Sequence, residues 1–551
     1  MDLFNQLDAV IQKNLSALKK PGVMTVRPGY KITGGWITKQ PAIVVTVEHK
    51  RADISPQDAV PPRIDNYPTD VRQATRMQKL RRSDSQLHAT LAVAARPEFA
   101  QPEFPLERDV QTGKLLEASV APASVQAMTA KAKIAYTPPT GASLAAVSGK
   151  MSLTCHASPD AGWLELSQFL ADIQEQLTVG IYDFTSAHIL KSVTAGLSGK
   201  QRLNLVLDHP ALNHSADQSD DQTEADLAKS LGAREQFAWA AEAHDPMVTK
   251  AIFPTAYHIK VAVKDHESFW LSSGNWNNSN QPEINPFDNS ADPAHIAAIA
   301  KKSDRDWHVI MNHAGLAKTF EAFLERDLEV AIPLQADRRA AAALPSAASM
   351  PNPEQPIQAP RAPLRYFQPL EIKNEQATVQ PLLTPDTGAG NYAANILKLI
   401  HSATSKLYIQ TQYIHPPKPG ADAELQRLID AVQAKIAAGL DVRIILSEFE
   451  ATGGWLEKLQ EAGLEMSAVR IQQGVHNKGF VVDSRVVALG SQNWSGDGVL
   501  RNRDATLIIH HVGAAQYYEG IFTHDWTNLA VQKLLSQVST SGGRRAGAAA
   551  N

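Results

Sequence analysis

The spacing of apolar residues along this chain follows two different periods, which predict where helices and strands form. Near the amino terminus, apolar side chains recur at helical spacing, which predicts an amphipathic helix built on Leu3, Leu7, Val10, Ile11 and Leu18. The run from Ile43 to Val47 is rich in β-branched residues and follows Gly-rich turns, a pattern typical of a strand. Residues 1–82 are therefore predicted to form a small α/β module.

Two longer stretches, residues 150–335 and 379–538, repeat the same order of helical and strand-like patterns. Each opens on a Pro-Asp pair, continues through a helical pattern into a β-rich run, and closes on a strand that carries a histidine. The alternation of strand and helix predicts an α/β sandwich with mostly parallel strands, built twice. A duplicated fold of this kind offers a site at the interface of its halves.

Three segments lack these patterns. Residues 83–149 have weak periodicity, which predicts an extended connector with some helix. Residues 336–378 are predicted as a linker, because Ala and Pro are frequent there and large apolar groups are few. Residues 539–551 are mostly Ser, Gly and Ala, a composition that predicts a flexible tail.

Composition narrows the class of protein. The chain has 551 residues, of which 43% are hydrophobic, and its net charge of -4 gives no overall attraction to nucleic acid or anionic lipid. Its single cysteine, Cys155, excludes an internal disulfide and a cysteine-based zinc site. We expect a cytoplasmic protein without a transmembrane segment, because long apolar runs and signal-peptide features are missing, and export by a signal-independent route stays open.

A set of polar residues recurs at the same spacing in both halves. In the first half these residues are His258, Lys260, Asp265, Ser273 and Asn275. In the second half they are His476, Lys478, Asp483, Ser491 and Asn493, and in both halves the serine and asparagine are candidates either to bind phosphate or to support the pocket. Side chains two positions apart in a strand share a face, so each histidine and its lysine are predicted to face one pocket, with the serine and asparagine at its mouth. Coincidence is a poor explanation of this match.

Two histidines beside two lysines suit the cleavage of a phosphodiester. One imidazole can attack phosphorus while the other protonates the departing oxygen, if they begin in opposite protonation states. The lysines and asparagines can stabilise the charge on the equatorial oxygens of the transition state. This scheme requires no cofactor, and we propose no metal site.

The two blocks resemble the paired HKD motifs of the phospholipase D superfamily, over roughly residues 150–335 and 379–535. The resemblance implies two phospholipase D-like α/β sandwich repeats packed as a pseudo-dimer, and a reaction through a covalent phosphohistidine. The roles that it implies are His258 as nucleophile, His476 as general acid, Lys260 and Lys478 as phosphate ligands, Asn275, Asn493, Ser273 and Ser491 as supporting residues of the pocket, and Asp265 and Asp483 as structural residues.

Members of this family also place a carboxylate downstream of each motif, where it orients a histidine. Asp306 and Asp504 are the candidates in this chain. The first half departs from the family pattern, because Ser272 stands where Gly is usual and a longer loop precedes Asp306. Glu283 lies in that loop and competes with Asp306 for the role.

The resemblance does not choose the substrate, because the same pocket serves phospholipids and nucleic-acid backbones in the family. The acidic balance and the lack of an extended basic stripe favour hydrolysis of phospholipid head-group diesters. A metal-independent endonuclease acting on DNA or RNA and a non-catalytic phosphate or lipid sensor stay open. The basic cluster between Arg72 and Arg82 is typical of a solvated helix face, and a peripheral membrane contact is the alternative. The oligomeric state is not predicted.

Overall fold

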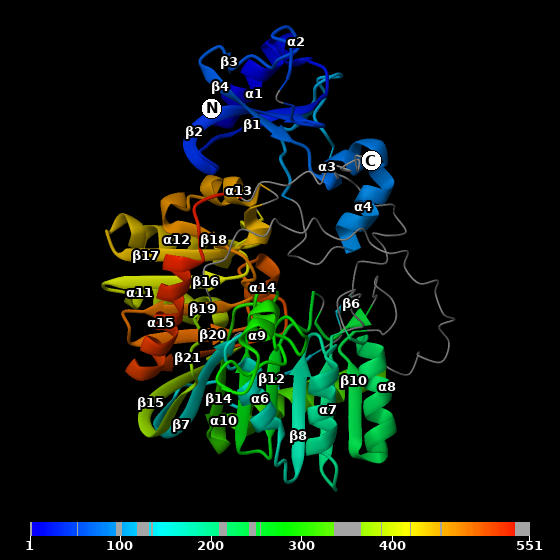
Figure 1. Cartoon of the computed structure of the whole chain (residues 1–551), viewed down its shortest axis with the longest axis vertical. Coiled ribbons are helices and arrows are strands. Elements are labelled where there is room, and N and C mark those ends of the chain that lie inside the picture. Colours follow the sequence, from blue (N-terminus) through cyan, green and yellow to red (C-terminus); the bar gives the residue numbers. More distant parts are fainter. Residues whose placement is uncertain are drawn as a thin grey trace, which may run out of the picture.

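A computed structural model describes most of the chain (Figure 1). The described residues are 3–51, 53–94, 102–117, 132–133, 136–208, 217–241, 250–253, 255–334, 365–386, 388–418, 420–451 and 454–534. The tail predicted over residues 539–551 lies outside them, as does most of the predicted linker. Within these ranges no helix is both long and apolar enough to cross a bilayer.

The amino-terminal module is a five-stranded sheet, in the order β3-β4-β2-β1-β5, with helices beside it. Its elements are α1 (Leu3–Lys13), α2 (Leu15–Leu18), β1 (Val23–Thr33), β2 (Trp36–Val47), β3 (Arg63–Ile64), β4 (Tyr67–Gln73), α3 (Arg76–Ser83), α4 (Ser85–Ala94) and β5 (Arg108–Asp109). The predicted helix is present as α1, which buries Leu7 and Ile11, and Ile43 and Val45 of β2 belong to the same core.

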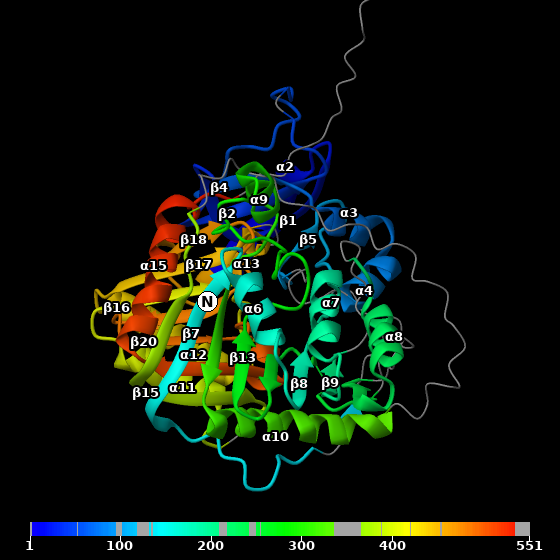
Figure 2. The ribbon, with the colours of Figure 1, turned by 60° about the horizontal axis from the view of Figure 1, so that its bottom comes forward.

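The two halves build one sheet of 14 strands, in the order β10-β9-β8-β12-β13-β14-β7-β15-β21-β20-β19-β16-β17-β18. The first half supplies β7 (Val147–Ser158), β8 (Gln176–Ile181), β9 (Arg202–Leu207), β10 (Glu235–Trp239), β12 (Lys260–Lys264), β13 (Ser268–Ser272) and β14 (Asp306–Asn312). The second half supplies β15 (Leu370–Thr384), β16 (Lys406–Thr411), β17 (Asp441–Ser447), β18 (Val469–Gln472), β19 (Lys478–Val482), β20 (Val486–Gly490) and β21 (Asp504–His510). The halves join where β7 and β15 lie side by side (Figures 1 and 2).

Helices cover both faces of this sheet. They are α6 (Gly162–Leu170), α7 (Ala187–Gly196), α8 (Asp220–Leu231), α9 (Pro293–Ala300) and α10 (Ala314–Ala331) in the first half, and α11 (Tyr392–Ser402), α12 (Ala423–Ala437), α13 (Trp455–Glu461), α14 (Gly496–Leu500) and α15 (Val512–Asn528) in the second. Alternate residues of β12 divide between two cores, since Val261 packs with α10 and α15 and Ala262 packs with α6 and α7. The expected pair of α/β sandwiches is therefore confirmed.

The prediction of mostly parallel strands was wrong. Parallel pairs occur among β8, β9 and β10 and among β16, β17 and β18, whereas the pairs between β8 and β16 are antiparallel. The short turn within each motif makes one antiparallel pair in each half, and in these turns Asp265, His266, Asp483 and Ser484 have φ between 51° and 60°. Such left-handed turns form hairpins, which join antiparallel neighbours.

The last part of the segment predicted as a linker belongs to the sheet. Strand β15 begins at Leu370 and pairs with both β7 and β21. The first half of β15 is rich in charged and polar residues and lacks the apolar alternation that usually marks a strand, so the sequence does not reveal it. In the structure, hydrogen bonds to two neighbouring strands hold it in the sheet. A short pair, β6 (Ala132–Lys133) with β11 (Lys250–Ala251), likewise lies partly in the predicted connector.

The amino-terminal module docks on α13 of the second half, which lies directly beneath it in Figure 1. Arg27 and Arg72 both bind the buried Glu457 carboxylate, at 2.5 and 2.8 Å. Although burial opposes the shift, these two guanidinium groups lower the pKa of Glu457 to about 2. The Arg72 guanidinium is therefore bound to a carboxylate of the protein itself. Arg81 of the same basic cluster binds the Glu117 carbonyl.

Two buried arginine–aspartate pairs cross between the halves. Arg503, which precedes β21, binds both oxygens of Asp327 on α10, at 2.7 and 2.8 Å. Arg305, which precedes β14, binds Asp525 on α15 at 3.0 Å and also binds Asp160. Since each arginine is followed directly by a candidate orienting carboxylate, these pairs fix the position of both carboxylates.

Asp327→Ala is expected to lower the free energy of unfolding by about 3–5 kcal/mol, because it leaves the buried Arg503 guanidinium unpaired. The measurement is urea unfolding followed by circular dichroism. Glu329→Ala on the same helix is the matched control, since Glu329 forms an exposed pair with Arg326 that contributes about 1 kcal/mol or less. Equal unfolding midpoints for the two variants would contradict the role given to Asp327.

Candidate active site

Main-chain hydrogen bonds bring the two motif histidines to the junction of the halves. His476 precedes β19, and its N–H donates to the Arg305 carbonyl of the first half at 3.1 Å. In the reciprocal contact, the Arg503 N–H of the second half donates to the Ala256 carbonyl at 2.9 Å, close to His258. Each histidine therefore lies beside the strand that carries the other half's carboxylate.

The histidines and carboxylates pair across the two halves. His258 Nδ1 lies 2.8 Å from Asp504 Oδ1, and His476 Nδ1 lies 3.0 Å from Asp306 Oδ1. Both carboxylates are fully buried. Glu283, by contrast, is exposed, and the group that it influences electrostatically is His188. The geometry gives the orienting position in the first half to Asp306.

The motif serines hold these carboxylates. Ser273 Oγ donates to Asp306 Oδ1 at 2.7 Å, and Ser491 Oγ donates to Asp504 Oδ1 at 2.5 Å. Each serine oxygen also accepts the N–H of the residue that follows the carboxylate. Of the two roles expected for the serines, the structure shows the supporting one.

Both motif lysines are buried within the site. Lys260 Nζ donates to the His258 carbonyl at 2.5 Å, and Lys478 Nζ donates to the His476 carbonyl at 2.6 Å and to the Ser273 carbonyl at 3.3 Å. Burial lowers the pKa of Lys260 well below its ordinary value, and the nearby Lys478 charge adds to this effect. An anion that enters this site would favour the charged forms of both lysines, and the lysines would in turn attract the anion.

Burial and neighbouring charges shift the pKa of His258 and of Asp306, the carboxylate beside His476. Burial and the Lys260 charge lower the pKa of His258 to about 4, although Asp504 opposes the shift. At Asp306, burial raises the pKa, but the charges of His476 and Lys478 outweigh it and bring the value to about 2. Asp306 is therefore ionised at neutral pH and accepts a hydrogen bond from His476.

Each motif asparagine stands two residues after the serine that holds an orienting carboxylate. Asn493 Nδ2 donates to Gln412 Oε1 at 3.2 Å. The side-chain oxygens of Asn275 and Asn493 are buried without a partner in the part of the chain that the structure describes. These amides retain hydrogen-bonding capacity for a ligand.

The motif aspartates lie at the far end of their strands. Asp265 accepts the backbone N–H groups of Gln174, Glu175 and Gln176, and Asp483 accepts those of Thr404, Ser405 and Lys406. Burial opposes the shift, but these bonds lower the pKa of Asp483 well below its ordinary value. Each aspartate thus ties its hairpin turn to the start of the neighbouring strand, β8 or β16, and lies away from the histidines.

Sequence reasoning missed one aromatic residue of the site, Tyr182. The Tyr182 ring lies 5.0 Å from the His258 ring, and Lys260 Nζ lies 5.1 Å from the Tyr182 centroid. Tyr182 directly follows β8, the strand that pairs with β12. Its place at the end of a buried strand, followed by Asp183, was the signal available in the sequence.

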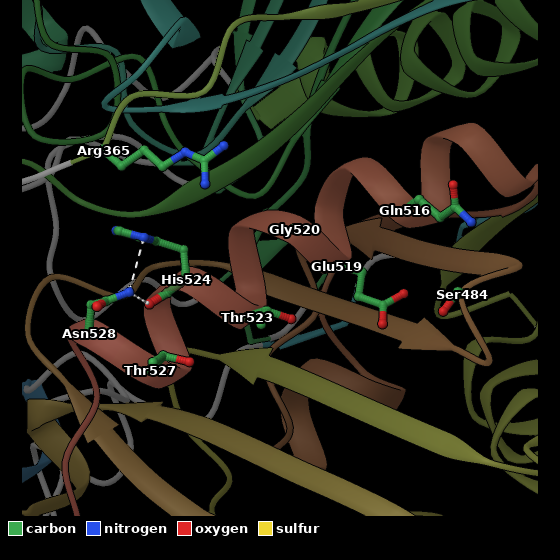
Figure 3. A pocket seen from close by; sticks show the side chains of 9 residues that line it. All are labelled: Arg365, Ser484, Gln516, Glu519, Gly520, Thr523, His524, Thr527 and Asn528. Atoms are coloured by element: carbon green, nitrogen blue, oxygen red, sulfur yellow. Dashed lines mark hydrogen bonds between the residues drawn. The ribbon is translucent and has the colours of Figure 1, made fainter.

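A depression lies on the outer side of α15, and none of the motif residues lines it (Figure 3). Its lining is polar, with Arg365, Glu519 and His524 among the side chains, and Asn528 donates to the His524 carbonyl at 2.9 Å. Ser484, at the far end of β19 from His476, also borders it. The depression is therefore separate from the histidine site. Across the described ranges, no three His, Cys, Asp or Glu side chains cluster as a metal site would require.

Comparison with known proteins gives a family match in the second half and partial matches to two named relatives. The family model described as cardiolipin synthase, PLD-like domain, matches residues 396–526. The cardiolipin synthase of Listeria welshimeri is 23% identical over 168 residues, which cover 29% of this chain and 33% of that protein. Cardiolipin synthase 2 of Staphylococcus epidermidis is 26% identical over 149 residues, covering 26% of this chain and 28% of that protein. This chain thus aligns with only about a third of each relative's length.

Solved structures also resemble the chain at low identity. Phosphatidylserine synthase of Haemophilus influenzae has a TM-score of 0.44 and 13% identity, and the match covers 70% of this chain and 89% of that one. The second half carries the matched PLD-like domain, and the first half repeats its strand order and its histidine–lysine motif. The match to a PLD-like domain and the repeated motif together support a relationship of this chain to the phospholipase D superfamily.

Proposed function

We propose that this protein is a phosphodiesterase that cleaves the head-group phosphodiester of phospholipids through a covalent phosphohistidine. The observation that carries the proposal is the pair of crossed histidine–carboxylate contacts, at 2.8 and 3.0 Å, around two buried lysines. This arrangement offers a nucleophile, an acid and an anion site together. The PLD-like domain matched over residues 396–526 supports the same chemistry.

The hydrogen bond to Asp504 suits His258 to be the nucleophile. An ionised carboxylate only accepts hydrogen bonds, so His258 carries its proton on Nδ1 and keeps a lone pair on Nε2. Its pKa of about 4 leaves the ring neutral at neutral pH. Attack by Nε2 on phosphorus would place positive charge on the ring, and the Asp504 carboxylate stabilises that charge.

His476 is then the general acid. As the Nε2–phosphorus bond forms, the bond from phosphorus to the departing alcohol oxygen breaks, and His476 supplies the proton that this oxygen takes up. In the second step neutral His476 accepts a proton from water, the water oxygen bonds to phosphorus, and the bond to His258 breaks. Lys260, Lys478, Asn275 and Asn493 stabilise the phosphoryl oxygens in both steps.

The names of the relatives support a phospholipid substrate. The matched family model and the relatives named above are cardiolipin synthases, proteins named for making a phospholipid. Hydrolysis and transfer to an alcohol share the phosphohistidine and differ only in whether water or a hydroxyl group resolves it. We propose hydrolysis as the basal reaction, with a suitable alcohol as a competing acceptor.

His258→Ala is expected to abolish release of choline from phosphatidylcholine vesicles, because it removes the nucleophile. His476→Ala is expected to slow it by about 10²–10⁴-fold, the usual contribution of a general acid. The measurement is turnover by purified protein, with the exposed His295→Ala as the matched control. Single- and double-stranded DNA are assayed in parallel at low and moderate salt. Cleaved DNA with intact lipid would move the protein to the nucleases, and full activity in both site variants would exclude the shared site.

His258 is expected to titrate near pH 4, well below an ordinary histidine, because burial and Lys260 disfavour its charged form. The measurement is a pH titration of the protein labelled with ¹⁵N histidine, followed by NMR. The His258 signal is assigned by its loss in His258→Gln, and below neutral pH it should still report a neutral ring protonated on Nδ1. A midpoint near 6.5 would contradict the proposed resting state.

A further inference from the structure

The two histidine–carboxylate pairs differ at the second oxygen of the carboxylate. Asp306 Oδ2 accepts a hydrogen bond from Asn280 Nδ2 at 3.0 Å. Asp504 Oδ2 is buried, and no group in the described ranges donates to it. The first oxygens are alike, since each accepts a histidine and a serine. The site is therefore asymmetric at one hydrogen bond.

Asn280 is held firmly in this position. Its side chain is buried, its Oδ1 accepts the Asn275 N–H at 2.9 Å, and its Nδ2 also donates to Asp304 at 3.1 Å. The packing around it is tight, because a Cβ added to Gly274 would lie 2.8 Å from the Asp306 carboxylate and 2.9 Å from Asn280 Cβ. Asn280 thus links a motif asparagine to an orienting carboxylate.

The second half makes the same turn without this side chain. Gly498 follows Asn493 by the interval at which Asn280 follows Asn275, and its N–H donates to Ser495 Oγ at 3.1 Å, as the Asn280 N–H donates to Asn277 Oδ1 at 2.9 Å. A Cβ on Gly498 would lie 2.1 Å from the Asn493 carbonyl oxygen. The second half therefore has no room for an equivalent of Asn280.

We propose that Asn280 is a positioning residue for His476, because its amide disperses the charge of Asp306 and lets His476 give up its proton to the departing oxygen more readily than it would without that amide. A donor to a carboxylate stabilises its charge and weakens its hold on a neighbouring proton. Asp504 lacks this donor and retains its charge for the cationic ring that forms when His258 attacks phosphorus. The inference rests on the proposed function and gives a physical basis for the roles of the two histidines.

Several other charged groups surround His476 and remain in place when Asn280 is replaced. Lys478 of β19 lies 3.1 Å from the His476 ring, and Asp306 and His308 of β14 act on it electrostatically. Lys260 of β12 is coupled to Asp306, and Asp304 shares the Asn280 amide. Removing the amide leaves all of these groups in the chain.

The test compares wild type with Asn280→Ala on two diesters, phosphatidylcholine in mixed micelles and bis(p-nitrophenyl) phosphate. Choline is a poor leaving group that needs the acid, whereas nitrophenolate leaves without a proton. We expect phosphatidylcholine turnover to fall about tenfold or more, and bis(p-nitrophenyl) phosphate turnover to change by about twofold or less. The basic limb of the phosphatidylcholine pH profile should move up by roughly half a unit, because His476 holds its proton more tightly.

Ser279→Ala is the matched control, since the Ser279 hydroxyl binds Asn277 and is not a ligand of Asp306. Both substrates are read on one preparation, so a loss of folded protein lowers both rates equally and leaves their ratio unchanged. An unchanged ratio with an unmoved pH limb in Asn280→Ala would overturn the role of Asn280 alone. Failure of wild type to cleave either diester would overturn the proposed function together with this inference.

Discussion

The buried arginine–aspartate pairs that cross the two halves are the constraint on which the site depends. Arg305 binds Asp160 and Asp525, and Arg503 binds Asp327. A buried guanidinium is costly unless it is paired, so these contacts hold α10 and α15 against the start of the opposite half's strand. Because each arginine directly precedes an orienting carboxylate, the interaction that joins the halves also aims the histidines.

The same geometry sets the electrostatic balance of the site. Two lysines and two aspartates are buried in space beside the histidines, so their opposite charges compensate each other away from water. This charge cluster is a local feature. The net charge of the whole chain, which is -4, gives no sign of it. A phosphate entering this site would meet fixed donors that need little reorganisation.

Much of the site could be predicted from the sequence, because its signal is a spacing repeated in two halves. Alternation predicts that each histidine shares a face with the lysine two positions on. The structure brings all four side chains together, although β12 and β19 begin only at Lys260 and Lys478. The crossing of Asp306 to His476 could not be predicted in this way, since it depends on how the halves pack. Asn280 carries no motif, and only the contrast with Gly498 in three dimensions reveals its contact with Asp306.

The shared sheet and the crossed contacts also bear on how such a chain can change over time. A duplicated domain usually provides a spare copy, in which one half can drift while the other keeps working. Here each half delivers the carboxylate that the other half's histidine requires. A lesion in either copy therefore damages both, and selection acts on the two repeats as a single indivisible unit.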